Sequence, residues 1–420
     1  MKHRVRPMMG ALYACTLSLA SLHLSASAIA ADGTKSVDVP VQPFSGELRG
    51  PYQTGTFEAF WVNDALDDPS TAAVGDKRKV MVQAWYPAAP APQLPFAPYA
   101  ISPQLYGKEH WVHRLEHVRT QSRLNAPVAA GQSSLPLLIY NHGNGNPHFT
   151  GTFQTEFLAS HGYVVVAIGH PGANSLERFP DGTKYKNDGE QWRAPAPAGL
   201  SQREAYEYQA AHADLSLYLG DLSFVLDRLT QLNADPAHPF YRRLDLQRVG
   251  SLGWSLGGFV SLQAARDDSR IKAAANLDGW PWGLLGPKGA VTLGVERPVL
   301  LMFNGGVEPN AQGDGLADPD YIETWFTVFS DVWELLRRST KEWYYVSIAG
   351  TNHESFSDRP LFFADKRKQW MNPQAAHEIV NAYTLEFFDK HVRGAAVEPP
   401  LLSGAKSFPE ATLIRRRPPK

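Results

Sequence analysis

Residues 248–266 read RVGSLGWSLGGFVSLQAAR, and this stretch decides the fold class. Its first part, 248–252, predicts a short buried strand, and 259–266 predicts a helix. Between them, Gly253, Ser255 and Gly257 form a G-x-S-x-G pattern. A strand, this pattern and a helix in that order are typical of a sharp turn that exposes a serine hydroxyl at the end of a sheet. We therefore predict a nucleophilic Ser255 in preference to a plain glycine-rich turn.

The composition is that of a globular protein with a sizeable core. The chain has 420 residues, of which 43% are hydrophobic and 20% charged, which are ordinary proportions for folded proteins. The formal net charge of −2 lacks the basic excess that nucleic-acid binding requires. We therefore expect no nucleic-acid partner.

Residues 1–30 have the pattern of a secretory signal peptide. Three basic residues, Lys2, Arg4 and Arg6, precede an apolar run over 8–24 that contains no Asp, Glu, Lys or Arg. Small residues follow, and we place the cleavage site after Ala30. Because the run is short and ends in small residues, a cleaved signal is favoured over a membrane anchor. We expect an exported protein, either periplasmic or extracellular.

The single cysteine, Cys15, lies within this leader. A lipoprotein signal around Cys15 fits poorly, because Tyr13 stands where a small residue is expected. After cleavage the chain would contain no thiol, and so no disulfide, cysteine nucleophile or thiolate metal site. His142 and His148 lack the neighbouring ligands of a metal site. We expect neither a metal nor a cofactor.

Alternating strand and helix patterns predict an α/β fold, with a mainly parallel sheet covered by helices on both faces. We divide the chain into the leader, a lead-in segment at 31–75 with one or two short strands, an α/β domain at 76–395 and a C-terminal tail at 396–420. We expect the end of the tail, 415–420, to be frayed and solvated. Strands are predicted at 80–86, 135–140, 163–168, 248–254, 271–277, 298–303 and 343–348, and helices at about 153–161, 202–232, 257–267, 320–339 and 374–391.

The loop after the last predicted strand carries the candidate base. A serine hydroxyl needs a base to remove its proton and an acid to orient that base. In this kind of architecture the acid and then the histidine follow the serine along the chain. His353 follows the strand at 343–348, and no other histidine stands at a strand end so late in the chain. We therefore predict His353 as the base.

Two residues are candidates for the acid. Asp278 stands directly after the strand at 271–277, and Glu308 follows the strand at 298–303. The commonest arrangement places the acid after the later strand, which favours Glu308. Asp278 lies directly at the end of its strand, so no additional loop residues are needed to place it near the serine, and this favours Asp278. Position alone does not choose between them.

Backbone N–H groups from two loops are predicted to bind the oxyanion. The first donor is Leu256, the residue after the nucleophile. The second is Asn144, in the loop that follows the strand at 135–140. Such donors stabilise the negative charge that develops on the attacked carbonyl oxygen.

Four segments together resemble the plasma type of the platelet-activating-factor acetylhydrolase family, within the α/β-hydrolases. They are 142–145 followed by 157–167, then 253–258, 276–280 and 351–358, and the resemblance covers roughly residues 80–390. It implies an α/β-hydrolase fold and a metal-free triad of Ser255, Asp278 and His353, and so it selects Asp278 as the acid. The family usually has histidine where Trp254 stands, and the segment 172–205 has no matching motif.

The resemblance also implies the reaction and the substrate class. The family cleaves short or oxidised acyl groups from phospholipids, and bacterial relatives include broader esterases. We therefore expect an exported serine ester hydrolase for short-acyl or phospholipid-like esters, with transient contact to a lipid surface. A polyester (cutinase-like), dienelactone or amide substrate is the alternative among hydrolases. A non-catalytic binding protein on a hydrolase scaffold is the alternative of another class.

Aromatic residues near the predicted triad are candidates for substrate contact. Trp254, Trp280 and Trp282 are such candidates, although Trp280 and Trp282 fit a core position equally well. The segment 172–205, rich in Gly and Pro, is the candidate lid. The helix at 320–339 carries large apolar residues at helical spacing, which we expect in the core; they are Trp325, Phe326, Phe329, Trp333 and Leu336. Nothing in the sequence predicts the oligomeric state.

Overall fold

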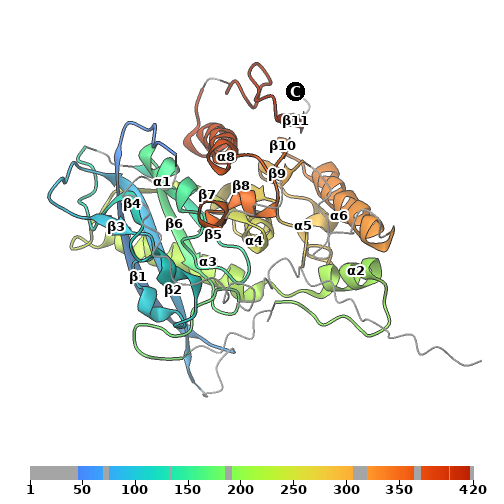
Figure 1. Ribbon diagram of the computed structural model, residues 1–420, viewed down its shortest axis with the longest axis horizontal. Coiled ribbons are helices and arrows are strands. Elements are labelled where there is room, and N and C mark those ends of the chain that lie inside the picture. The colour runs from blue at the N-terminus through green and yellow to red at the C-terminus, as the bar shows by residue number, and fades with distance from the viewer. Residues whose placement is uncertain are drawn as a thin grey trace, which may run out of the picture.

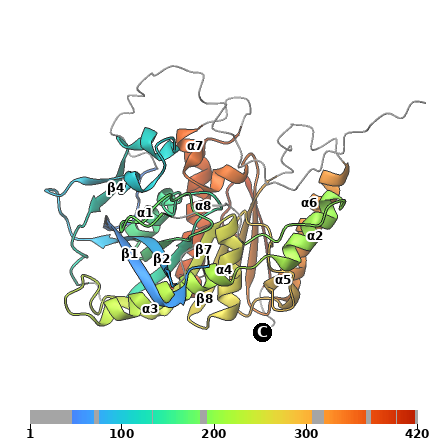
Figure 2. The same cartoon turned by 90° about the horizontal axis from the view of Figure 1, so that it is seen from below.

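The computed structural model describes residues 46–69, 75–131, 134–184, 192–305, 319–363, 370–396 and 398–416, with the backbone alone at 319–321. Within these residues, eleven strands form one sheet in the order β11-β10-β9-β8-β7-β5-β6-β2-β1-β4-β3. Helices cover both faces of this sheet (Figures 1 and 2). The predicted leader at 1–30 lies outside the described residues.

The centre of the sheet consists of parallel strands. They are β5 (Leu135–Asn141), β6 (Val164–Gly169), β7 (Leu244–Trp254), β8 (Ile271–Leu277), β9 (Val299–Asn304) and β10 (Trp343–Ile348). Every residue of β5, β6 and β9 is buried, because helices cover both faces, and this explains their continuous apolar sequences. The predicted α/β-hydrolase architecture is confirmed.

The helices divide into two layers. One face of the sheet packs against α3 (Ser216–Ala234), α4 (Leu256–Asp267), α5 (Ala290–Leu293) and α6 (Pro319–Arg338), and the other against α1 (Thr152–Ser160) and α8 (Pro373–Phe388). Helix α2 (Gln202–His212) lies beside α6 (Figure 2). The single helix predicted at 202–232 is thus two helices. The Asp214 carboxylate accepts the N–H of Ser216 at the start of α3, and such local side-chain bonds favour helix ends over helix interiors.

Both ends of the described chain contribute strands: the lead-in segment was expected to hold one or two short strands, and the tail was expected to hold none. The lead-in segment contains β1 (Gln53–Asp67), a long strand that pairs antiparallel with β2 (Lys77–Ala88). The tail contains β11 (Ala411–Arg416), which pairs antiparallel with β10, so the expectation of a frayed end was wrong for Arg415 and Arg416. The pairing satisfies backbone groups that β10 would otherwise expose at the sheet edge.

The remaining elements are short. They are β3 (Phe96–Pro98), β4 (Arg119–Leu124), α7 (Arg359–Phe362), 3₁₀ turns at Pro103–Leu105, Trp111–Leu115 and His353–Phe356, and a π turn at Asp389–Arg393. No helix in the described part of the chain combines the length and the apolar character needed to cross a membrane.

Helix α6 follows the core prediction only in part. Trp325 and Leu336 are buried, as expected, but the side chain of Phe326 is 72% exposed and that of Trp333 is 38% exposed. Trp325, Val328 and Val332 form the stripe that faces the sheet, and Phe326 is one position further around the helix. Its exposure therefore follows from the helical period.

Candidate active site

Ser255 occupies the tight turn between β7 and α4 that its motif predicts. Its backbone has φ 56° and ψ −121°, a conformation that costs a residue other than glycine about 1–3 kcal/mol. A Cβ at Gly257 would overlap the backbone carbonyl of Asn141, and a Cβ at Gly253 would overlap Gly257. The two glycines are therefore required by close backbone contacts.

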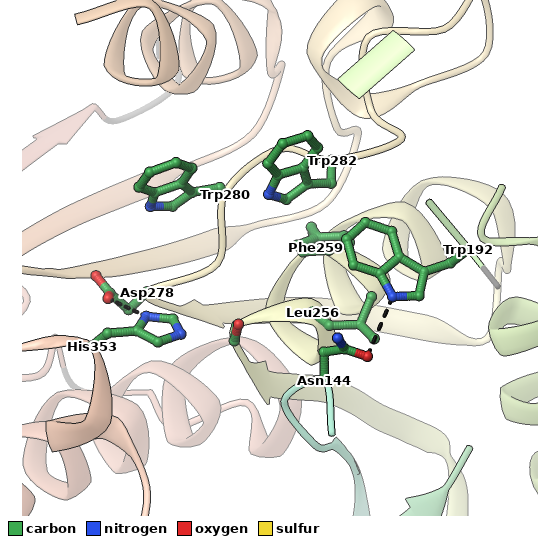
Figure 3. A pocket seen from close by; sticks show the side chains of 9 residues that line it. Asn144, Trp192, Leu256, Phe259, Asp278, Trp280, Trp282 and His353 are labelled. Atoms are coloured by element: carbon green, nitrogen blue, oxygen red, sulfur yellow. Dashed lines mark hydrogen bonds and ion pairs between the residues drawn. The ribbon is translucent and has the colours of Figure 1, made fainter. Parts of the chain in front are cut away.

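Asp278 and His353 approach the pocket of Ser255 from two other strand ends. Asp278 is the first residue after β8, and its Oδ2 lies 2.7 Å from Nδ1 of His353, in the loop after β10. With Nδ1 bonded to the carboxylate, Nε2 is the ring nitrogen that can exchange a proton with a serine hydroxyl. The three residues line one pocket (Figure 3).

Asn304, the last residue of β9, holds the Asp278 carboxylate. Its backbone N–H donates to Oδ1 at 3.0 Å, and its side-chain amide donates to Oδ1 at 3.2 Å and to Oδ2 at 3.1 Å. The sequence analysis missed this residue; the signal is a polar side chain at the end of an apolar strand. The alternative acid, Glu308, lies outside the described residues.

The loop after β5 presents the predicted second oxyanion donor. The Gly143 carbonyl accepts the N–H of Asn146 at 3.2 Å and lies 2.8 Å from Nδ1 of His142. In a planar trans peptide, the N–H of Asn144 points opposite to that carbonyl. Fixing the carbonyl therefore fixes the direction of the Asn144 N–H. Leu256, the other predicted donor, opens α4, so its N–H has no acceptor within the helix.

A buried polar network sets the protonation of His142. The backbone N–H of His170 donates to Nε2 of His142 at 3.1 Å, so Nε2 is an acceptor and Nδ1 carries the proton donated to Gly143. Burial lowers the pKa of His142 to about 3, which keeps the ring neutral. The His170 ring lies 2.9 Å from Oδ1 of Asn141 and 3.1 Å from Oδ2 of Asp221.

An ion pair completes this network. Asp221 accepts from Nη2 of Arg78 at 2.7 Å, and both side chains are buried. Burial alone would raise the pKa of Asp221, but the Arg78 guanidinium lowers it below its ordinary value. The charged pair therefore supports the oxyanion loop from within the core.

Comparisons with known proteins agree with this geometry. A family model described as PETase, PET hydrolase-like, matches residues 220–290. The platelet-activating factor acetylhydrolase of Canis lupus familiaris is 22% identical over 302 residues, which are 66% of this chain and 61% of that protein. A probable 1-alkyl-2-acetylglycerophosphocholine esterase of Arthroderma benhamiae is 22% identical over 262 residues, 60% of this chain and 57% of its own.

A solved structure extends the likeness to the whole fold. The ferulic acid esterase from Streptomyces cinnamoneus superimposes with a TM-score of 0.63 at 26% identity, covering 89% of this chain and all of that one. The chain has an α/β-hydrolase fold and is similar in sequence to platelet-activating factor acetylhydrolases. It spans about three fifths of the length of the curated relatives that it matches.

In this acetylhydrolase-like protein, Trp254 lies beneath the site and does not line the pocket, in contrast to the prediction. Its side chain is 0% exposed, and a Cβ at Gly143 would lie 2.6 Å from Cε3 of its ring. Its indole N–H donates to the backbone carbonyl of His353 at 2.9 Å. Trp254 is the last residue of β7. It therefore contacts both the oxyanion loop, at Gly143, and the histidine loop, at the carbonyl of His353.

The pocket of this α/β-hydrolase is walled by aromatic side chains. Trp280 and Trp282 line it, as their position in the sequence suggested, and Trp192 and Phe259 line it as well. The free space among these side chains is about 10 Å³, roughly enough for one water molecule.

The sequence analysis missed Trp192 and Phe259 as pocket residues. Trp192 belongs to the candidate lid at 172–205, of which 185–191 lie outside the described residues. The available signal was a lone tryptophan in a polar segment rich in glycine and proline. No group of His, Cys, Asp or Glu that could hold a metal ion occurs in the part of the chain that the structure describes.

Proposed function

We propose that this chain hydrolyses carboxylic esters through an acyl-enzyme on Ser255. The observation that carries the proposal is the 2.7 Å contact between Asp278 and His353 at the pocket that holds Ser255. The strained elbow presents the hydroxyl, and the histidine supplies the base that a serine nucleophile requires. The names of the matched proteins, an acetylhydrolase and esterases, support the same reaction class.

The proposed reaction proceeds in two halves. Nε2 of His353 accepts the proton of Ser255 as Oγ attacks the ester carbonyl, and Asp278 stabilises the imidazolium. The N–H groups of Leu256 and Asn144 bind the oxyanion, each typically contributing about 2.7–4 kcal/mol to transition-state stabilisation. His353 then protonates the departing alcohol. A water molecule repeats the attack on the acyl-enzyme and releases the acid.

The small pocket supports short acyl groups as the preferred substrates. A free space of about 10 Å³ holds about one water molecule, which leaves little room for a long acyl chain. We therefore propose acetyl-type esters, including phospholipid-like esters presented at a lipid surface. A second candidate is an ester of an aromatic acid, favoured by the four aromatic walls and by the family model for PET hydrolase-like proteins.

Replacement of the nucleophile tests this function. We expect Ser255→Ala to reduce hydrolysis of nitrophenyl acetate by at least about 1,000-fold, because the remaining groups cannot form an acyl-enzyme. A fluorophosphonate probe should label the unmodified protein and not the variant. The exposed Ser269→Ala serves as the matched control. Hydrolysis that survives in Ser255→Ala would refute the mechanism, and a native protein that neither hydrolyses esters nor reacts with the probe would favour the non-catalytic binding protein.

We also propose that the protein is exported after removal of residues 1–30. The basic start, the apolar run and the small residues around Ala30 support this proposal. Expression of the full chain, followed by fractionation and N-terminal sequencing, should recover a protein beginning at Ala31 outside the cytoplasm. An uncleaved chain in the cytoplasm would contradict it.

A further inference from the structure

The geometry of the site assigns a direction to the acyl group of the substrate. The leaving oxygen must face His353, which protonates it, and the oxyanion must face the N–H groups of Leu256 and Asn144. The acyl substituent must therefore point away from both groups, toward the aromatic side chains that line the pocket. Figure 3 shows Trp192, Phe259 and Trp282 on the Leu256 side of the pocket, with His353 and Asp278 on the opposite side.

Trp192 differs from the other walls in its place in the fold. Phe259 belongs to α4, and Trp282 packs against Tyr206 of α2 with ring centroids 5.0 Å apart. Trp192, in contrast, is the single buried residue of the stretch 192–200. It is 2% exposed, whereas residues 193–200 are partly or fully exposed. One large side chain of a surface segment is thus inserted into the pocket.

Several contacts hold this side chain in the pocket. Its indole N–H donates to Oδ1 of Asn144 at 3.4 Å, and its backbone carbonyl accepts the N–H of Asp214 at 2.8 Å. The Arg193 guanidinium lies 5.0 Å from the Trp192 ring centroid and 5.2 Å from that of Trp282, within the range of a cation–π contact. The segment is therefore anchored both to the oxyanion loop and to the junction of α2 and α3.

We propose that Trp192 is the specificity-determining residue that limits the acyl group to about the size of acetyl. The inference rests on the proposed ester hydrolysis and names the side chain that closes its acyl pocket. Trp192 itself belongs to neither a helix nor a strand, and its indole packs against Phe259 with ring centroids 5.8 Å apart and against Trp282 with ring centroids 6.2 Å apart. Because the indole lines the pocket, its removal would add space beside these two rings. Removing Phe259 would instead take a core side chain from α4.

The test is a series of acyl chain lengths. We would measure kcat/KM for nitrophenyl acetate, butanoate, hexanoate and benzoate with the native protein, Trp192→Ala, Trp192→Phe and Trp192→Leu. Each methylene buried in a new pocket is worth about 0.8 kcal/mol, or roughly fourfold in kcat/KM. Trp192→Ala should therefore raise the butanoate-to-acetate ratio by at least about 10-fold, and the hexanoate and benzoate ratios further. Trp192→Leu and Trp192→Phe should give smaller increases.

A matched control separates this effect from a general loss of packing. Trp333→Ala makes the same substitution on α6, outside the pocket, and should leave every ratio unchanged. If Trp192→Ala does not fold, as judged by thermal melting, the Trp192→Leu and Trp192→Phe ratios decide the matter.

The outcomes distinguish the two proposals. Unchanged ratios in all three Trp192 variants, or a native protein that cleaves hexanoate as well as acetate, would overturn the role of Trp192 and leave ester hydrolysis standing. A native protein that cleaves none of the esters and does not react with a fluorophosphonate would overturn the proposed function itself.

Discussion

Alanine at position 143 is a direct test of the oxyanion loop. A Cβ at Gly143 would lie 2.6 Å from Cε3 and 2.8 Å from Cζ3 of Trp254. An ordinary carbon–carbon contact is about 3.5–4 Å, so either the ring or the loop must move by roughly 1 Å. Trp254 is buried and hydrogen-bonded to the His353 carbonyl. We therefore expect the loop to move.

The expected cost follows from the geometry of the donor. An oxyanion donor acts at about 2.7–3.1 Å, and a displacement of roughly 1 Å takes the Asn144 N–H out of that range. Losing one such donor typically costs about 2.7–4 kcal/mol, or 100- to 1,000-fold in kcat. KM should change little, because the bond is strongest in the transition state. Gly143 has no positive φ, so the effect arises from the contact and not from backbone strain.

Steady-state kinetics with nitrophenyl acetate would measure this loss. Gly220→Ala is the matched control, since a Cβ at Gly220 meets no atom within 4 Å and the site lies within α3. That control should keep the native kcat and the native or a slightly higher melting temperature. If Gly143→Ala folds and keeps kcat within about threefold of the native protein, the Asn144 N–H is not an oxyanion donor.

Two further predictions concern the acid and the pH dependence of stability. Asn304→Ala removes the side-chain donors to Asp278 and keeps the backbone donor. Because hydrogen bonds to a charged group contribute about 1.5–3 kcal/mol, kcat/KM should fall about 10- to 150-fold. A variant with the native kcat/KM would contradict this prediction. Burial, assisted by Glu207 and Glu334 and opposed by the Tyr206 hydroxyl, raises the pKa of Asp331 to about 6. A raised carboxyl pKa means that its stabilising contribution is complete below the unfolded-state pKa and is lost as pH rises through about 6. Between pH 4 and 7, the free energy of unfolding of Asp331→Asn should therefore rise by about 1 kcal/mol relative to that of the native protein. This value is reduced because the carboxyl is partly exposed. Urea unfolding at several pH values would measure it, and the same pH dependence in both proteins would refute it.

The strands and the elbow were predictable because their signals are local. A strand buried on both faces needs a continuous apolar run, and β5, β6 and β9 each have one. The strand, the G-x-S-x-G pattern and the helix of the elbow follow one another within residues 248–266, although the contacts that exclude a Cβ at Gly253 and Gly257 include the distant carbonyl of Asn141. The strand at 411–416 was not predicted, because its pairing partner, β10, lies more than sixty residues earlier in the chain.

The surroundings of the acid depended on which strands are neighbours. The sequence left Asp278 and Glu308 both open until the family resemblance favoured Asp278. The sheet order puts β9 beside β8, so that Asn304 reaches the Asp278 carboxylate. No pattern within one segment contains that adjacency.

The sequence by itself determined the class of fold and the candidates for nucleophile and base, because periodicity and turn chemistry act within a few residues. Only the tertiary structure decided where the side chains of Trp254 and Trp192 lie. Trp254 looked like a pocket residue by its place in the elbow, yet the packing of two loops buries it completely. Trp192 had no motif, yet packing inserts it into the pocket between Asn144 and Trp282. The direction in which a large side chain points is set by the space that distant elements leave, and that space exists only after the sheet and its helices have assembled.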